Sequence, residues 1–136
     1  MRFSVIPLVG LAVSVWIAPL GSVQASSSPS ATLAGAKVVS ADDVAKAQSA
    51  GAVVVDARTA VQYSVAHIKG AINIPYRGKD FKLGRMPANK AAPIVIYCNG
   101  VECSKASMVA VGAGYTNVLW YRDGFSNWVS YDRPTE

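Results

Sequence analysis

Short runs of consecutive apolar residues alternate with amphipathic stretches along this chain. Residues 52–55 and 94–97 form two such runs, which are rich in β-branched side chains. Runs of this kind are typical of strands that are buried on both faces of a parallel sheet. They predict two central strands, and weaker apolar runs at 38–39, 72–74 and 117–121 predict three more.

Helical patterns separate these predicted strands. Ser40 stands three residues before Asp43, and this capping arrangement predicts a short helix that ends near Gly51. Further helices are expected at 59–66, 104–111 and 125–129, and a long loop with at most one helical turn at 76–92. Strands that alternate with short helices predict an α/β fold, with a mainly parallel central sheet flanked by short helices.

The beginning of the chain has a different character from the rest. After Arg2, residues 3–20 carry no charge and are rich in aliphatic side chains, and a Val-Gln-Ala sequence ends at Ala25. This pattern predicts a signal peptide, residues 1–25, that is cleaved on export to the periplasm or the medium. The alternative is a retained anchor in the inner membrane, which the shortness of the run and the prolines Pro7 and Pro19 disfavour.

The remaining residues are predicted to form one domain preceded by a linker. Residues 26–36 are small and polar, which predicts a flexible linker, and the ordered domain is expected over 37–136. The chain has 136 residues, of which 51% are hydrophobic and 15% charged. This composition favours a single folded domain and argues against intrinsic disorder.

The formal net charge of +5 is spread along the chain, and its densest basic segment lies within the predicted loop at 77–85. Nucleic-acid binding calls for a denser basic patch with interleaved aromatic side chains, so no nucleic-acid partner is expected. A mildly basic surface of this kind attracts small anions.

The two cysteines of the chain, Cys98 and Cys103, follow the second central strand directly. Ligands of parallel sheets bind beyond the carboxyl ends of the strands, near helix amino ends. Backbone N–H groups in such a turn, together with the positive end of the following helix, favour a thiolate and can bind an anion. The position of Cys98 therefore predicts a reactive nucleophile.

Two other interpretations of the cysteines remain open. An exported protein meets an oxidising compartment, so Cys98 and Cys103 could form a structural disulfide of modest stabilising effect. A metal site is disfavoured, because the single histidine, His67, lies far away in the sequence.

Four segments, in this order along the chain, carry a family resemblance. They are the strand that ends in Asp56-Ala-Arg58, the segment His67-Ile-Lys-Gly-Ala-Ile-Asn-Ile-Pro75, the strand–Cys98–helix unit, and Gly114-Tyr-Thr-Asn-Val118 followed by Gly124-Phe-Ser-Asn-Trp128. Together they resemble the rhodanese (thiosulfate sulfurtransferase) family over residues 37–130.

The resemblance implies a sulfurtransferase mechanism that uses Cys98. Its thiolate would take a sulfane sulfur from thiosulfate or a persulfide donor and become a persulfide, and a thiol acceptor, small or protein-borne, would remove that sulfur. No metal and no organic cofactor is implied. The expected sulfur- and anion-binding loop consists of Asn99, Gly100, Val101, Glu102, Cys103 and Ser104.

The other matched residues are expected to have supporting roles. Asp56 and Arg58 are interpreted as a structural ion pair at a strand end, and His67 as the anchor of a turn through hydrogen bonds. Trp128 is expected in the core.

The loop departs from the family pattern at Cys103, where many members have an arginine. The missing arginine weakens the case for thiosulfate as the donor, and the negative charge of Glu102 opposes binding of a dianion. The missing arginine also argues against phosphatase chemistry, which needs an arginine to hold the phosphate. Because Cys103 could attack a Cys98 persulfide, a thiol–disulfide redox protein with a reductant partner is an alternative function, and a non-enzymatic sulfur-relay or binding module is another.

Overall fold

The computed structural model describes residues 10, 32–78, 81–100 and 103–136. Its described part contains a six-stranded sheet in the order β1-β2-β6-β5-β3-β4. The strands are β1 (Thr32–Leu33), β2 (Ala36–Val38), β3 (Val53–Asp56), β4 (Ile72–Asn73), β5 (Ile94–Tyr97) and β6 (Val118–Tyr121). Only the β1–β2 pair is antiparallel. The predicted α/β fold with a mainly parallel sheet is confirmed.

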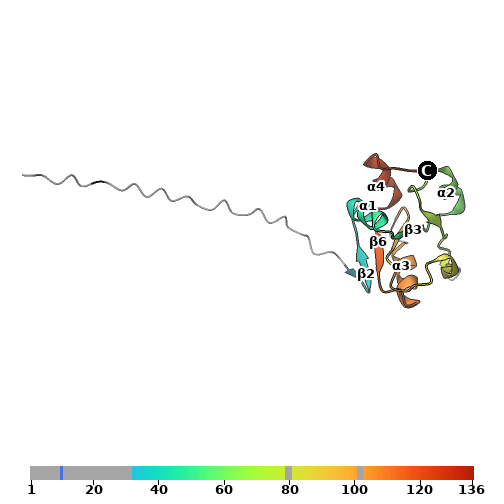
Figure 1. Cartoon of the computed structure of the whole chain (residues 1–136). Helices are drawn as coiled ribbons and strands as arrows, with labels where there is room; N and C mark the ends of the chain where they lie inside the picture. The colour runs from blue at the N-terminus through green and yellow to red at the C-terminus, as the bar shows by residue number, and fades with distance from the viewer. Residues whose placement is uncertain (1–9, 11–31, 79–80, 101–102) are drawn as a thin grey trace, which may run out of the picture.

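Helices cover both faces of this sheet. They are α1 (Ala41–Ser49), α2 (Ala60–Val65), the 3₁₀ turn η2 (Leu83–Arg85), α3 (Cys103–Gly112) and α4 (Gly124–Ser130). Figure 1 shows α1 and α4 together on one side of the strands and α3 on the other. The carboxyl ends of the parallel strands therefore emerge between two helical layers.

The two central strands separate the apolar core into two parts. Side chains alternate between the faces of a strand, so Val54 and Val95 pack on the face of α1 and α4, whereas Val55 and Ile96 pack on the face of α3. All four residues of β5 are inaccessible to solvent. This burial on both faces was predicted from the unbroken apolar run, and it fixes the chain up to Tyr97.

The start of α1 follows the predicted capping pattern. The Asp43 N–H donates to the Ser40 hydroxyl at 3.2 Å, and the Ser40 N–H donates to the Asp43 carboxylate at 3.0 Å. This reciprocal box satisfies two N–H groups that a helix start leaves without intrahelical partners.

The sheet begins earlier than the sequence predicted. Strand β1 and the first residue of β2 lie within 26–36, where a flexible linker was expected, because Thr32 and Leu33 pair with Lys37 and Ala36. Apart from Gly10, the predicted signal peptide lies outside the described residues. Among the residues that are described, no helix combines the length and the apolar character needed to span a membrane.

The predicted loop at 76–92 folds back against the α3 face of the sheet. Phe81 and Met86 are buried there, on either side of the single turn η2. The loop is thereby fixed close to the end of β4, beside the site described next.

Candidate active site

Cys98 stands at the carboxyl end of the central strand β5, where a parallel sheet is expected to bind its ligands. The helix α3 begins at Cys103, so its positive amino end lies at the same loop. Cys98 is partly exposed, whereas Cys103 is only 1% exposed. The arrangement leaves Cys98 as the cysteine that a ligand can reach.

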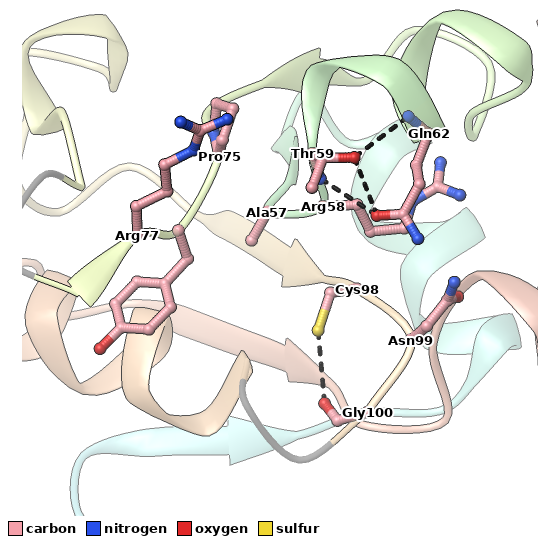
Figure 2. A pocket seen from close by; sticks show the side chains of 10 residues that line it. Ala57, Arg58, Thr59, Gln62, Pro75, Arg77, Cys98, Asn99 and Gly100 are labelled. Atoms are coloured by element: carbon pink, nitrogen blue, oxygen red, sulfur yellow. Dashed lines mark hydrogen bonds between the residues drawn. The ribbon is translucent and has the colours of Figure 1, made fainter.

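A cavity of about 400 Å³ opens over Cys98. Its described lining residues come from the segments that follow β3, β4 and β5 and from the start of α2, and they are Ala57, Arg58, Thr59, Gln62, Pro75, Tyr76, Arg77, Cys98, Asn99 and Gly100. Figure 2 shows Pro75 and Arg77 on one side of Cys98, and Thr59 and Gln62 on another. The volume suits a small molecule.

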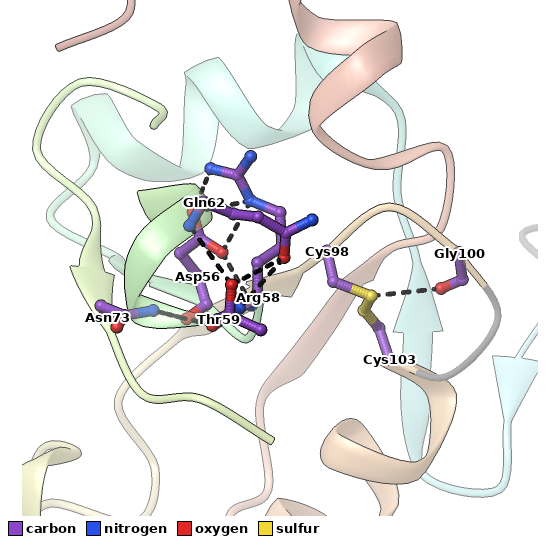
Figure 3. Close-up of a disulfide and its surroundings, with 8 residues drawn as sticks. All are labelled: Asp56, Arg58, Thr59, Gln62, Asn73, Cys98, Gly100 and Cys103. Atoms are coloured by element: carbon purple, nitrogen blue, oxygen red, sulfur yellow. Dashed lines mark hydrogen bonds and ion pairs between the residues drawn. A yellow bond between two sulfur atoms is a disulfide. The ribbon is translucent and has the colours of Figure 1, made fainter. Parts of the chain in front are cut away.

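The structure joins Cys98 and Cys103 in a disulfide, with their Cα atoms 5.9 Å apart (Figure 3). The Cys98 Sγ also lies 3.3 Å from the carbonyl oxygen of Gly100. In this oxidised form Cys98 has no thiolate, so a reductant must open the bond before the sulfur can act as a nucleophile.

The start of α4 holds the Cys98 backbone in place. The Phe125 N–H donates to the Cys98 carbonyl oxygen at 2.8 Å. Gly124 has φ +72°, and a Cβ at this position would overlap that oxygen and lie 3.1 Å from the carbonyl carbon of Cys98. Only glycine fits both the conformation and the close approach. The sequence singled out this segment as part of the resemblance but gave no hint that it positions Cys98.

Asp56, Arg58 and Tyr97 form a buried cluster behind the cavity. The Arg58 guanidinium donates to the Asp56 carboxylate, with the closest Nη2–Oδ2 distance at 2.6 Å, and the Tyr97 hydroxyl donates to Oδ2 at 2.6 Å. Arg58 Nη2 also donates to the Ala66 carbonyl at 2.7 Å, and its Cζ lies 3.9 Å from the centre of the Phe125 ring. The cluster links β3, β5 and the start of α4.

Two pKa values in this cluster are shifted. Burial acts to lower the pKa of Arg58, but the hydrogen bonds and charge of Asp56 outweigh it and raise that pKa. Burial, together with the hydrogen bond to Asp56, raises the pKa of Tyr97 well above its ordinary value. Both groups therefore keep their protons, which fits a structural ion pair better than proton transfer.

His67 takes part in a second set of contacts, away from the cavity lining. Its Nδ1 lies 2.9 Å from the Tyr63 carbonyl oxygen, and its ring stacks on the Tyr63 ring. Its backbone N–H and C=O pair with those of Glu136, whose side-chain oxygen lies 3.5 Å from the His67 Nε2.

Trp128 is buried, and its indole N–H donates to the Pro134 carbonyl at 2.9 Å.

The structure brings some of the predicted site residues together and separates others. Cys98, Asn99, Gly100 and Arg58 line one cavity, whereas Asp56 and His67 do not. Cys103 and Ser104 lie in the first turn of α3. Val101 and Glu102 fall outside the described residues.

Several lining residues were missed by the sequence reasoning. They follow β3 and β4, and they are Ala57, Thr59, Gln62, Pro75, Tyr76 and Arg77. Pro75, Tyr76 and Arg77 follow a predicted strand closely, which was a usable signal, whereas Thr59 and Gln62 lie in the predicted helix 59–66. The sequence did not give the order β5-β3-β4 that brings these strand ends beside Cys98.

Within the described ranges, no three His, Cys, Asp or Glu side chains gather as a protein metal site requires. The cavity contributes two arginines, of which Arg58 is paired with Asp56 and Arg77 is exposed. The site thus offers a cysteine sulfur and a positive charge to a small anion.

The family model for the rhodanese-like domain matches residues 40–131. The chain belongs to this family. A thiosulfate:glutathione sulfurtransferase from Saccharomyces cerevisiae is 31% identical over an alignment of 91 residues, with coverage of 58% of this chain and 66% of the relative. The thiosulfate sulfurtransferase PspE from Escherichia coli is 32% identical over 65 residues, 47% of this chain and 62% of the relative.

The rhodanese-like chain spans less than two thirds of the length of either relative. Among solved structures, the Alr3790 protein from Anabaena sp. is similar, with a TM-score of 0.63, 25% identity, and coverage of 72% of this chain and 90% of that one. The relatives support a sulfurtransferase-like role for this rhodanese-like domain.

Proposed function

We propose that this rhodanese-like protein is an exported sulfurtransferase that carries sulfane sulfur as a persulfide on Cys98. The observation that carries the proposal is the position of Cys98. It is the partly exposed residue at the end of the central strand, at the mouth of a cavity and beside the amino end of α3. The resemblance of the loop to the family's active-site segment adds support.

The donor step begins once the Cys98–Cys103 disulfide has been reduced by a dithiol. The Cys98 thiolate attacks the outer sulfur of thiosulfate, a new S–S bond forms, and sulfite leaves with the electron pair of the broken bond. Arg77 supplies a positive charge beside the cavity for the anionic donor. The loop N–H groups from Asn99 to Ser104 are proposed to bind the persulfide sulfur, aided by the helix end.

The acceptor is proposed to be a thiol. Its thiolate attacks the outer sulfur of the persulfide, and the electron pair of the S–S bond returns to Cys98. Glutathione is a reasonable first acceptor to test, because the yeast relative is named as a thiosulfate:glutathione sulfurtransferase. A protein thiol is the other acceptor class.

Intact-protein mass spectrometry tests the proposal. The protein is reduced, freed of reductant and treated with thiosulfate, and a mass gain of one sulfur atom on Cys98 is expected. Cys98→Ala is expected to lose both this gain and sulfur transfer, whereas the matched variant Cys103→Ala is expected to keep them. If the wild type gains no sulfur from thiosulfate or from a persulfide donor, the enzyme proposal fails and a non-enzymatic binding module remains.

The disulfide favours one second candidate, a thiol–disulfide redox protein. An accessible Cys98 bonded to a buried Cys103 can be attacked by a partner thiol at the accessible sulfur. In that case Cys103 also resolves any persulfide, expelling hydrosulfide as the disulfide re-forms. The redox function gains support if Cys103→Ala is as inactive as Cys98→Ala in a reductant-coupled assay.

Export is a separate part of the proposal. Residues 1–25 are proposed to be a signal peptide that is removed before the protein works, with a linker between the cleavage site and the domain. Amino-terminal sequencing of protein from the periplasm tests it. A mature chain that begins at Ser26 is expected, and an intact amino terminus in the membrane fraction would indicate a retained anchor.

A further inference from the structure

A second cavity, of about 510 Å³, adjoins the one that holds Cys98. Among the described residues, five line it, of which Arg77, Lys82 and Arg85 are cationic and the others are Ile74 and Pro75. Pro75 and Arg77 line both cavities, as Figure 2 shows for the Cys98 side. We call this second cavity the basic hollow.

Among the residues that the structure describes, no carboxylate forms an ion pair with a cation of the basic hollow. Every other arginine that the structure describes has a carboxylate within 4.0 Å. The pairs are Arg58 with Asp56, Arg122 with Asp123, and Arg133 with Asp42. In the described ranges, no such contact occurs for Arg77, Lys82 or Arg85, and all three are exposed. A cavity with three uncompensated positive charges favours an anionic ligand.

The hollow is also held firmly to the scaffold of the active site. The Arg85 guanidinium donates to the Asn73 carbonyl oxygen. The Asn73 side-chain amide donates in turn to the carbonyl oxygens of Asp56 and Arg58, at 3.0 Å each. This chain of hydrogen bonds fixes one charge of the hollow relative to strand β3, so little ordering is needed when a ligand binds.

We propose that the basic hollow binds the carboxylates of a small anionic thiol while its sulfur reaches Cys98. The inference rests on the proposed sulfurtransferase function and assigns the substrate class of its acceptor step. A thiosulfate ion has its charge next to its reactive sulfur and needs only the Cys98 cavity. A peptide thiol has carboxylates several bonds away from its sulfur, and two adjoining cavities fit such a molecule.

The hollow acts on binding and leaves the chemistry of the step unchanged. The acceptor thiolate bonds to the outer sulfur of the Cys98 persulfide, the S–S bond to Cys98 breaks, and Cys98 regains its thiolate. The product is the persulfide of the acceptor, with its carboxylates in the hollow. The cations therefore lower the KM for anionic thiols relative to neutral ones.

The experiment compares glutathione with its diethyl ester, which has the same thiol and no free carboxylate. Full-length Cys103→Ala protein is loaded with sulfur from thiosulfate, and kcat/KM for each acceptor is measured. We expect Lys82→Gln and Arg85→Gln each to lower the glutathione-to-ester ratio about twofold to fivefold through KM, and the double variant about tenfold. Arg85→Lys restores the ratio, and high salt reduces it in the unsubstituted hollow.

The matched control is Lys37→Gln, which removes the same charge from the exposed position of β2 and is expected to leave the ratio unchanged. An unchanged ratio in the double variant overturns the proposal. A loss that appears in sulfur loading from thiosulfate, with the acceptor ratio intact, also overturns it, because the hollow then serves the donor.

Binding of S-methylglutathione, which cannot accept sulfur, separates this proposal from the proposed function. Amide signals near Lys82 and Arg85 are expected to shift in NMR spectra on titration, and less so in the double variant. If these shifts occur while loaded protein transfers sulfur to neither thiol, the acceptor role of the hollow is overturned, whereas the proposed function fails only if the protein gains no sulfur from any donor. If the shifts are absent while transfer to both thiols proceeds, only the basic hollow is excluded.

Discussion

The two sides of the Cys98 cavity are built in contrasting ways. On one side, the buried cluster of Asp56, Arg58 and Tyr97 has each polar group bonded within the protein, and its members are at most 6% exposed. On the other side, Cys98 is partly exposed and Asn99 and Gly100 are exposed. Cys98 is held by the disulfide and by the contact with Phe125.

The buried cluster forms the fixed side of the cavity, and the cysteines form the side on which the chemistry can change. Arg58 and Tyr97 in the buried cluster keep their protons, because the hydrogen bonds and charge of Asp56 raise the pKa of Arg58 against the effect of burial, and burial together with the hydrogen bond to Asp56 raises the pKa of Tyr97. In the proposed mechanism, the cysteine side passes between thiol, persulfide and disulfide while the buried cluster stays unchanged. We therefore expect substitutions in the buried cluster to reduce stability most, and substitutions at the cysteines to change reactivity most.

The largest effect is expected for Asp56→Asn. This variant leaves the Arg58 charge buried without its carboxylate, and the expected loss in the free energy of unfolding is about 3–5 kcal/mol. Urea denaturation followed by circular dichroism measures it. Adding Arg58→Met is expected to recover part of the loss, because the unpaired charge is then removed. Strict additivity of the two losses would show that the pair is not coupled.

A smaller loss in the free energy of unfolding, of about 2–3 kcal/mol, is expected for Gly124→Ala. Gly124 connects the two sides, because it lies against the Cys98 carbonyl and the next residue, Phe125, contacts Arg58. A Cβ at φ +72° would be strained and would push against the Cys98 carbonyl, so the turn or the cysteine loop must shift. Sulfur loading of Cys98 is expected to slow as well. The control is Gly112→Ala in α3, where a Cβ meets nothing within 4 Å. Equal effects of the two variants would contradict a positioning role for Gly124.

Cys103→Ala is expected to lower the free energy of unfolding by about 2 kcal/mol under oxidising conditions. The loss is modest because the disulfide spans a sequence separation of only 5. Most of this loss is expected to vanish when both proteins are measured in reductant, which serves as the internal control. The same variant is expected to hold its Cys98 persulfide longer than the wild type, as mass spectrometry over time will show. A persulfide of equal lifetime in both proteins would exclude Cys103 as a resolving thiol.

The sequence predicted the rigid side better than the reactive side. The apolar runs before Asp56 and Cys98 predicted buried strands, and the β3–β5 pairing places these residues close together. The contact of Gly124 with Cys98 was beyond prediction, because it depends on β6 lying next to β5 and on the path of the turn that follows β6. The basic residues at 77–85 were visible as a charged loop, but the gathering of Arg77, Lys82 and Arg85 around one hollow depends on how Phe81 and Met86 anchor that loop.

The smallest effect is expected at the start of α1, none of whose residues is found among the described residues that line the cavity. Ser40→Ala removes the capping hydroxyl and is expected to lower the free energy of unfolding by about 1 kcal/mol, whereas Ser40→Thr keeps the cap and most of the stability. Sulfur loading of Cys98 is expected to be unchanged in both variants. A large loss of sulfur loading would show that the start of α1 is coupled to the Cys98 site, which would contradict this expectation.

The same cap predicts how stability depends on pH. The hydrogen bonds from the Ser40 backbone and side chain lower the pKa of Asp43 below its ordinary value of 3.8. A carboxyl group with a lower pKa in the folded state stabilises the protein above its unfolded pKa, and this contribution is lost as the pH falls through the folded pKa. The stability difference between wild type and Asp43→Asn is therefore expected to be full at neutral pH and to shrink below pH 3.8. Urea denaturation at a series of pH values measures it, and a difference that grows on acidification would contradict the capping role of Asp43.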